Sequence, residues 1–349
     1  MIITSNSDSD DRILVKKLAR AEQIGNQQVP EVSLRPQKLT ELIGRQNEKH
    51  ILSLLVHATK KKWEKSEKTA ADHVLFYGPP GLGKTTLAHI LANELGVTIK
   101  VTSGPAIERQ ADLIAILTNL AAGDVLFIDE IHRLRKPVEE LLYPAMEDFQ
   151  IDIIVGQGTA SQSVRFTLPP FTLVGATTRI GLLSSPLRDR FGVHLHLDFY
   201  ATQELEMMLE RLVKQDHLQA DAEALTEIAR RARGTARIAV RLLRRVKEFA
   251  LVHGEKERIT QKIAADTLDL LGIDVYGLDR LDQAILRTMI EKYDGGPVGL
   301  KTLAAAVGED EDTLEAVYEP YLMRAGFLKR TSRGRMVTKL VYEHLGQMI

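Results

Sequence analysis

The chain has 349 residues, of which 44% are hydrophobic and 27% are charged, and it contains no cysteine. This length predicts two or three domains, and the missing cysteines exclude a disulfide scaffold, a zinc finger and a cysteine nucleophile. With 46 basic and 47 acidic residues, the formal net charge of -1 excludes a uniformly basic surface of the kind that coats nucleic acid.

The first part of the chain predicts an α/β domain behind a short tail. Residues 1–30 read as a polar N-terminal tail, and residues 31–198 alternate apolar strands with helices. Strands are expected at 73–77, 97–101 and 125–128 and from residue 172, with helices at 86–95 and 112–122. The continuous apolar run at 125–128 is typical of a strand buried on both faces of a parallel sheet. The pattern therefore predicts a doubly wound parallel sheet.

Two smaller domains are predicted downstream. Residues 199–273 carry four helical segments, at 202–214, 221–233, 235–253 and 260–271, without a strand pattern, and Thr202 and Thr260 are plausible N-caps. Eight basic residues between 230 and 247 are interpreted as a solvated helix face. In residues 274–349, helices are expected at 278–293, 300–307 and 309–325, followed by a hairpin around residues 332–334. Three helices and a hairpin predict a winged helix.

A phosphate-binding loop is predicted at residues 78–85, which match G-x-x-x-x-G-K-[ST] between a strand and a helix. Its glycines let backbone N–H groups surround a phosphate at a helix N-terminus. Lys84 is expected to reach the β- and γ-phosphates, and Thr85 to ligate Mg²⁺. The nucleotide-binding residues predicted on this segment are Gly78, Gly81, Gly83, Lys84, Thr85 and Thr86.

An adjacent pair of carboxylates, Asp129-Glu130, ends the strand at 125–128. Ligands of open α/β sheets bind beyond the carboxyl ends of the strands. Asp129 is therefore expected to hold Mg²⁺ and Glu130 to polarise the water that attacks the γ-phosphate. The pair favours hydrolysis over nucleotide binding alone.

Together with residues 175–179 and 185–191, these motifs resemble the AAA+ ATPases, and longer stretches resemble one of their families, the RuvB branch-migration motors. The resemblance covers residues 31 to 345 in one order. It implies an AAA+ P-loop domain, a small helical lid domain at 199–273 and a C-terminal winged-helix domain that binds DNA.

The resemblance also implies roles for single residues. Thr178 matches a sensor of the γ-phosphate, and Arg237 a sensor arginine on the lid. Arg190 matches an arginine finger that acts on the ATP of a neighbouring subunit, which implies a homo-oligomeric ring, expected to be a hexamer. Further residues are implied near the nucleotide: Leu34, Arg35, Glu147, Asp148, Phe149 and Tyr200.

DNA and protein partners follow from the same resemblance. Arg330 and Arg335, in a basic stretch around the hairpin, match arginines that contact DNA, either duplex or a four-way junction. The acidic residues 309–312 depart from the basic residue that relatives often carry there, which puts a DNA contact at that loop in doubt. A second hairpin at 151–168 is implied to dock the junction-binding protein RuvA, with RuvC as a further candidate partner.

These features predict an ATP hydrolase that translocates DNA and, with RuvA, promotes branch migration of Holliday junctions in recombination and repair. Two alternatives remain open, an origin-recognition or clamp-loading ATPase that uses ATP as a loading switch, and a non-catalytic nucleotide-gated scaffold. No stretch reaches the roughly 20 apolar residues of a membrane span, and the N-terminus lacks the apolar core of a secretory signal. A cytoplasmic protein without membrane partners is expected.

Overall fold

The structure is a computed structural model that describes residues 35–65, 69–155, 162–253 and 258–346. The chain divides into a unit Met1–Arg35 and a unit Pro36–Ile349, and only the second is described below. Three predicted features are therefore not placed. The tail and Leu34 lie outside the described residues, and Arg35 belongs to the first unit.

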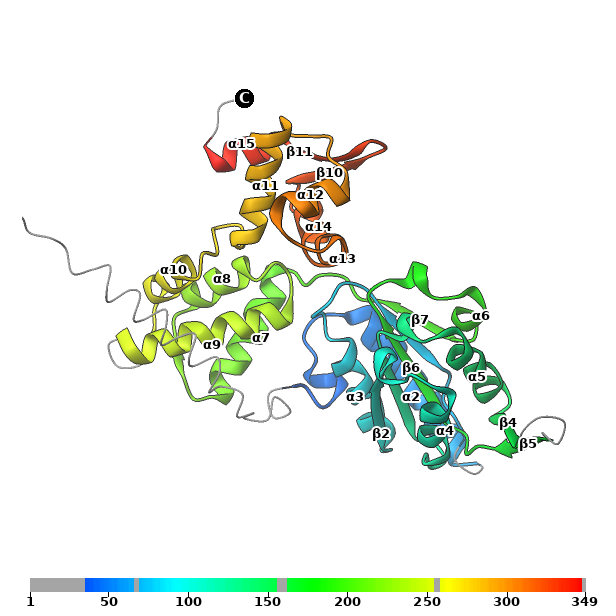
Figure 1. Cartoon of the computed structure of the whole chain (residues 1–349). Helices are drawn as coiled ribbons and strands as arrows, with labels where there is room; N and C mark the ends of the chain where they lie inside the picture. The colour runs from blue at the N-terminus through cyan, green and yellow to red at the C-terminus, as the bar shows by residue number, and fades with distance from the viewer. Residues whose placement is uncertain (1–34, 66–68, 156–161, 254–257, 347–349) are drawn as a thin grey trace, which may run out of the picture. The chain divides into compact units, whose positions relative to one another are not determined.

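A five-stranded parallel sheet forms the centre of the first domain (Figure 1). Its strands are β1 (Val74–Tyr77), β2 (Ile99–Ser103), β3 (Val125–Asp129), β6 (Thr172–Thr177) and β7 (Val193–His196), in the order β2-β3-β6-β1-β7. All six residues of β6 and the first four of β3 are buried, as the apolar runs predict for strands covered on both faces. Because β6 lies between β3 and β1, the carboxyl ends of these three strands meet at one edge.

Helices cover the sheet and complete its core. They are α2 (Gln46–Trp63), α3 (Lys84–Leu95), α4 (Gln110–Thr118), α5 (Lys136–Glu147) and the short α6 (Ser185–Arg188). Leu113 of α4 and Leu142 of α5 pack with Leu126 of β3 in one buried cluster. The expected strand at 97–101 begins two residues later, because the N–H of Val97 closes α3 by donating to the carbonyl of Ala92.

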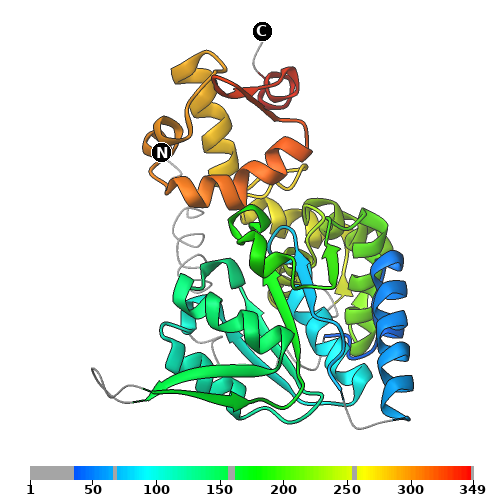
Figure 2. The same cartoon turned by 90° about the vertical axis from the view of Figure 1, so that its right-hand side faces the viewer.

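An antiparallel hairpin follows α5. It consists of β4 (Gln150–Val155) and β5 (Gln162–Thr167), and its turn lies outside the described residues. Figures 1 and 2 both show it projecting away from the parallel sheet. The hairpin expected at 151–168 is thus present.

The helical domain contains α7 (Thr202–Gln215), α8 (Ala222–Arg231), α9 (Ala236–His253) and α10 (Gln261–Leu270). The expectation that it lacks strands is wrong, because β8 (Gln219–Ala220) and β9 (Arg258–Ile259) form a short parallel pair. Thr260 caps α10 as expected, its hydroxyl accepting from the N–H of Ile263. Thr202 is not the cap of α7, since Ala201 holds that position.

The C-terminal domain has the helices and hairpin of a winged helix. Its main helices are α11 (Arg280–Tyr293) and α12 (Leu300–Val307), its hairpin is β10 (Leu328–Thr331) with β11 (Gly334–Val337), and α15 (Lys339–Leu345) follows. The expectation of a single helix at 309–325 is wrong. It is divided into α13 (Glu311–Thr313), the π-helical turn η8 (Leu314–Tyr318) and α14 (Glu319–Arg324). Pro320 has no N–H for a helical hydrogen bond, so the break falls just before it.

The fold class expected from the sequence is therefore confirmed, with a parallel-sheet P-loop domain, a helical domain and a winged helix. Across the described ranges, no helix combines the length and apolarity needed to cross a bilayer.

Candidate functional site

The predicted phosphate loop follows β1 at the sheet edge where the carboxyl ends of β3 and β6 also lie. The N–H of Gly78 donates to the carbonyl of Thr177 at 3.2 Å, which ties the loop to β6. Gly78 has a φ of +139°, and a Cβ there would lie 2.2 Å from the carbonyl oxygen of Leu197. Gly83, with a φ of +95°, is the N-cap of α3. This loop conformation therefore needs glycine, as the motif predicts.

Lys84 is folded into this loop. Its side chain is buried, and Nζ donates to the carbonyl oxygens of Gly78 and Pro79 at 2.8 and 2.9 Å. Burial lowers the pKa of Lys84 to about 8, against the attraction of Glu130 and Asp129. An ammonium group held by two neutral carbonyls gains a stronger, charge-assisted partner when phosphate oxygens arrive. The residues present therefore fit a nucleotide phosphate.

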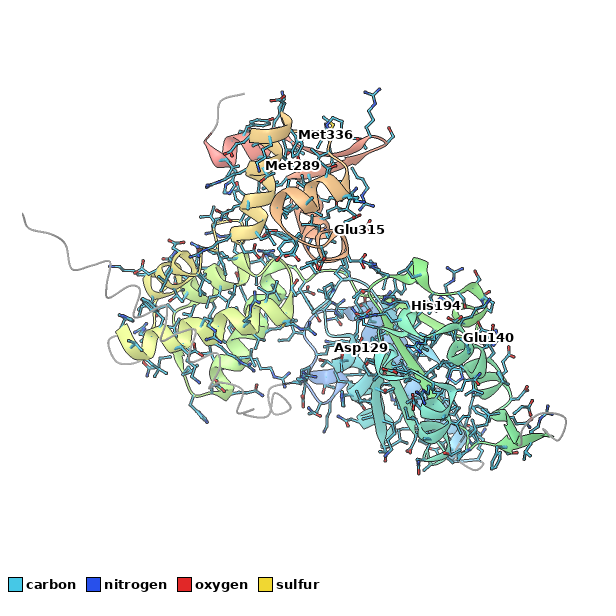
Figure 3. The ribbon with its side chains drawn as sticks, in the orientation of Figure 1. Asp129, Glu140, His194, Met289, Glu315 and Met336 are labelled. Atoms are coloured by element: carbon cyan, nitrogen blue, oxygen red, sulfur yellow. The ribbon has the colours of Figure 1, made fainter. Side chains whose placement is uncertain are left out.

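The two predicted acids lie at the end of β3, where Figure 3 labels Asp129. An Asp129 carboxylate oxygen accepts from the N–H of Glu130 at 3.0 Å, and Glu130 has a left-handed backbone with a φ of 47°. The hydroxyl of Thr178 donates to Glu130 Oε2 at 3.0 Å. The structure thus brings the predicted base and the predicted sensor into direct contact.

His132 also belongs to this site, although the sequence analysis missed it. Its Nδ1 lies 3.2 Å from Glu130 Oε2 and 2.8 Å from the hydroxyl of Thr177. Burial lowers the pKa of His132, which favours the neutral imidazole. The only sequence signal is its place two residues after Glu130 on the same turn.

The predicted finger, Arg190, is held on its own subunit by groups outside the phosphate loop. Its guanidinium lies 3.1 Å from a Glu147 carboxylate oxygen, donates to the carbonyl of Pro186 at 2.7 Å and stacks on the Tyr143 ring at 4.5 Å. Its Nε is buried without a hydrogen-bond partner among the described residues. Glu147, implied at the nucleotide, is thus a partner of Arg190.

Asp148 and Phe149, which were also implied near the nucleotide, lie in different surroundings. Asp148 is exposed at the end of α5. Phe149 packs edge-on against Phe171, with ring centroids 6.0 Å apart, and so belongs to the core of the domain.

The helical domain reaches the phosphate loop through two of the predicted residues. The backbone N–H of Arg237 donates to the carbonyl of Gly81 at 3.3 Å, while its side chain is exposed. The hydroxyl of Tyr200 donates to the carbonyl of Leu82 at 3.3 Å. Arg45, which the sequence analysis missed, donates to that same carbonyl at 3.0 Å and to the Tyr200 hydroxyl at 2.7 Å. A lone arginine in a loop carries no motif that would have identified it.

The two predicted DNA-binding arginines share one acidic partner. Arg330 and Arg335 both form ion pairs with Glu319, which is buried, and Arg330 also pairs with Glu315 at 3.0 Å. Burial raises the pKa of Glu319, but its hydrogen bonds to the two arginines outweigh this and lower it below its ordinary value. The Arg330 side chain is 47% exposed and that of Arg335 only 13%. Arg330 therefore offers more charge to a partner than Arg335 does.

The basic segment 230–247 is not simply a solvated face. Arg231 is 4% exposed and pairs with Glu227 at 2.7 Å and with Asp269 at 2.5 Å. Arg233 is 10% exposed and pairs with Asp282 at 2.5 Å. These two arginines hold elements together, because their carboxylate partners are within the protein.

Comparison with known proteins gives a match to one family along nearly the whole chain. Residues 34–197 match the model of the Holliday junction DNA helicase RuvB P-loop domain, residues 200–274 the RuvB AAA lid domain and residues 275–346 the RuvB C-terminal winged helix domain. A solved structure of Thermotoga maritima RuvB, described as a Holliday junction branch migration motor, is 52% identical with a TM-score of 0.81. A mutant of that protein is 53% identical with a TM-score of 0.82. Each match covers 90% of this chain and 99% of the other. The chain therefore belongs to the RuvB family of Holliday junction branch-migration ATPases.

Proposed function

We propose that this protein hydrolyses ATP with Mg²⁺ to drive Holliday junctions along DNA, in the cytoplasm and together with RuvA. The observation that carries the proposal is the meeting of three groups at the edge formed by β1, β3 and β6. They are the Lys84 loop, the Asp129-Glu130 pair and Thr178. Lys84 would bind the β- and γ-phosphates, Glu130 would orient the attacking water, and Thr178 would report the γ-phosphate through its bond to Glu130.

The residues present fit Mg²⁺ bound together with nucleotide. Within the described ranges, no three His, Cys, Asp or Glu side chains form a metal site by themselves. Mg²⁺ commonly takes one or two protein ligands and completes its shell with phosphate oxygens and water. Thr85, in the first turn of α3, and Asp129, at the end of β3, would be those ligands. Bound Mg²⁺ supplies neutralisation of the developing phosphate charge.

We infer that Arg190 completes the active site of a neighbouring subunit in a hexameric ring. Its contacts with Glu147, Tyr143 and Pro186 hold the guanidinium outside its own phosphate loop. A guanidinium stays charged and can bind phosphate oxygens in two places, which suits a finger. Arg190 would leave Glu147 when its guanidinium binds the nucleotide of the neighbouring subunit.

Mixing two inactive variants tests this arrangement. Lys84→Ala subunits and Arg190→Ala subunits should each lose ATP hydrolysis, whereas a mixture should regain part of it at interfaces that combine an intact loop with an intact finger. Arg188→Ala is the matched control, because Arg188 is an arginine two residues before Arg190 whose guanidinium contacts the Ser185 hydroxyl at 3.4 Å. A mixture that stays as inactive as its components would contradict a finger acting between subunits.

We propose that the hairpin β4–β5 is the docking surface for RuvA. Val164 and Phe166, two residues apart on β5, are 40% and 46% exposed, and exposed apolar side chains that lie together commonly mark an interaction site. Phe166→Ser should weaken capture of RuvA while ATP hydrolysis by the protein alone is unchanged. Unweakened capture would place the RuvA contact elsewhere.

The winged helix would hold duplex DNA by its phosphates. Lys329 and Arg333 are exposed on or next to its hairpin, close in sequence to Arg330. Such contacts position a protein on DNA without reading its sequence, as a motor requires. The loader-switch alternative is not favoured, because all three domain matches are to RuvB.

A further inference from the structure

One short segment of the helical domain is built onto the phosphate loop. The segment is residues 233–237, which follow α8 and include the first two residues of α9. Its Arg237 donates a backbone hydrogen bond to Gly81 at 3.3 Å, and a Cβ on Gly81 would lie 2.8 Å from the Thr235 methyl group. Its Gly234 carbonyl accepts from the N–H of Tyr200 at 2.8 Å. A movement of the phosphate loop on nucleotide exchange would therefore displace this segment directly.

The other end of the segment is fixed to the winged helix. Arg233 has a left-handed backbone with a φ of 56°, and its side chain points to the start of α11. Its guanidinium pairs with Asp282 at 2.5 Å and Asp279 at 3.0 Å, donates to the carbonyl of Gly277 at 2.6 Å and lies 5.2 Å from the Tyr321 ring. Asp282 is completely buried. Arg233 thus makes a multivalent, charge-assisted contact between the two domains.

Arg230 and Arg233 are close in sequence but differ in where their acidic partners lie. Arg230 is 53% exposed and pairs with Glu227, which lies on its own helix α8. Arg233 instead pairs with residues of α11 and of the loop before it. Five consecutive residues can span at most about 18 Å even when fully extended. A contact at Gly81 and a contact at Asp282 are therefore joined by a very short covalent path.

We propose that Arg233 is a positioning residue that joins the lid and the winged helix into one lever, so that movement at the phosphate loop is delivered to DNA. The proposal rests on the branch-migration function and adds the element that transmits force. Arg233 does not touch nucleotide or DNA in this role. It acts by keeping the angle between the lid and the winged helix constant while both move.

The test compares ATP consumption with junction movement in the assembled complex with RuvA. Arg233→Gln keeps a polar side chain but removes the charge that binds Asp282. The number of base pairs moved per ATP should fall about tenfold, within the range by which mutations along coupling networks act. ATP hydrolysis and DNA affinity should remain close to wild type, because the phosphate loop and the wing hairpin are untouched. Arg233→Lys should recover part of the coupling, and Arg230→Ala is the control that should change nothing.

A distance measurement between the lid and the winged helix tests the Arg233 contact independently of activity. The chain has no cysteine, so Lys262→Cys on the lid and Glu343→Cys on the winged helix give a single pair of dye positions. The distance distribution between the dyes should be narrow in the otherwise wild-type chain and broad with Arg233→Gln. If Arg233→Gln fails to fold, Asp282→Asn makes the same comparison from the other side of the pair.

The outcomes separate this proposal from the proposed function. A wild-type complex that hydrolyses ATP without moving a junction would count against branch migration itself. A wild-type complex that moves junctions, with an Arg233→Gln variant that moves them equally far per ATP or keeps a narrow distance distribution, would overturn the lever.

Discussion

The depressed pKa of Lys84 makes nucleotide affinity depend on pH in a direction that can be calculated. Burial brings this pKa from 10.5 to about 8, a cost to the charged form of roughly 3 kcal/mol. Phosphate groups are fully ionised well above their second pKa of about 6, so they bind the ammonium form. At pH 7 most Lys84 side chains are already charged, whereas at pH 9 only about one in ten is, so binding there must take up a proton. The dissociation constant should therefore rise about tenfold from pH 7 to pH 9.

Titration of a non-hydrolysable ATP analogue with Mg²⁺ at several pH values measures this slope. Calorimetry at pH 8 in two buffers of different ionisation enthalpy should also show about half a proton taken up per nucleotide. Lys84→Arg is the control, because a guanidinium remains charged throughout, and its weaker affinity should not vary with pH. A wild-type dissociation constant that is flat between pH 7 and pH 9, or a Lys84→Arg variant with the same slope, would refute the reasoning.

Two further substitutions probe the wing and the loop. Glu319→Gln removes the buried charge shared by Arg330 and Arg335, so the free energy of unfolding in urea should fall by about 3–5 kcal/mol. Duplex binding should tighten with a steeper salt dependence, because both arginines are released, and an unchanged salt dependence would mean that neither arginine faces DNA. Gly78→Ala places a Cβ 2.2 Å from a backbone carbonyl, so nucleotide affinity should fall about 5- to 150-fold, for a strain of about 1–3 kcal/mol. Gly96→Ala is its control, since its φ of +72° is also positive but a Cβ there meets nothing within 4 Å; equal losses in both variants would make backbone strain alone responsible.

The phosphate site could be predicted because its motif includes its own structural context. A strand before Gly78 and a helix from Lys84 leave little freedom for the loop, and Asp129 ends a strand whose apolar residues read directly as buried. The position of β6 between β1 and β3, which brings Thr178 to Glu130, depends on packing between distant segments. The resemblance implied a role for Thr178 at the γ-phosphate, but neither it nor periodicity predicted the contact with Glu130.

Charge patterns were less informative than motifs, because they do not show where the opposite charge lies. Arg330 and Arg335 read as equivalent, but the Arg330 side chain is 47% exposed and that of Arg335 only 13%. Their shared partner Glu319 begins α14, directly after the π-helical turn η8. Arg233 read as one of several solvated bases, yet its partner Asp282 lies 49 residues away, in a different domain. Figure 3 labels Glu315, which lies in η8 and is the second acid that pairs with Arg330.

Movement of a synthetic four-way junction is the most direct test of the central claim. Wild-type protein with RuvA, Mg²⁺ and ATP should convert a labelled junction into its two duplex products. A non-hydrolysable ATP analogue should not support conversion, and Glu130→Gln should bind nucleotide but leave the junction intact, because the attacking water loses its base. Hydrolysis of ATP on the junction without release of duplex products, or equal conversion with the non-hydrolysable analogue, would contradict an ATP-driven branch-migration motor.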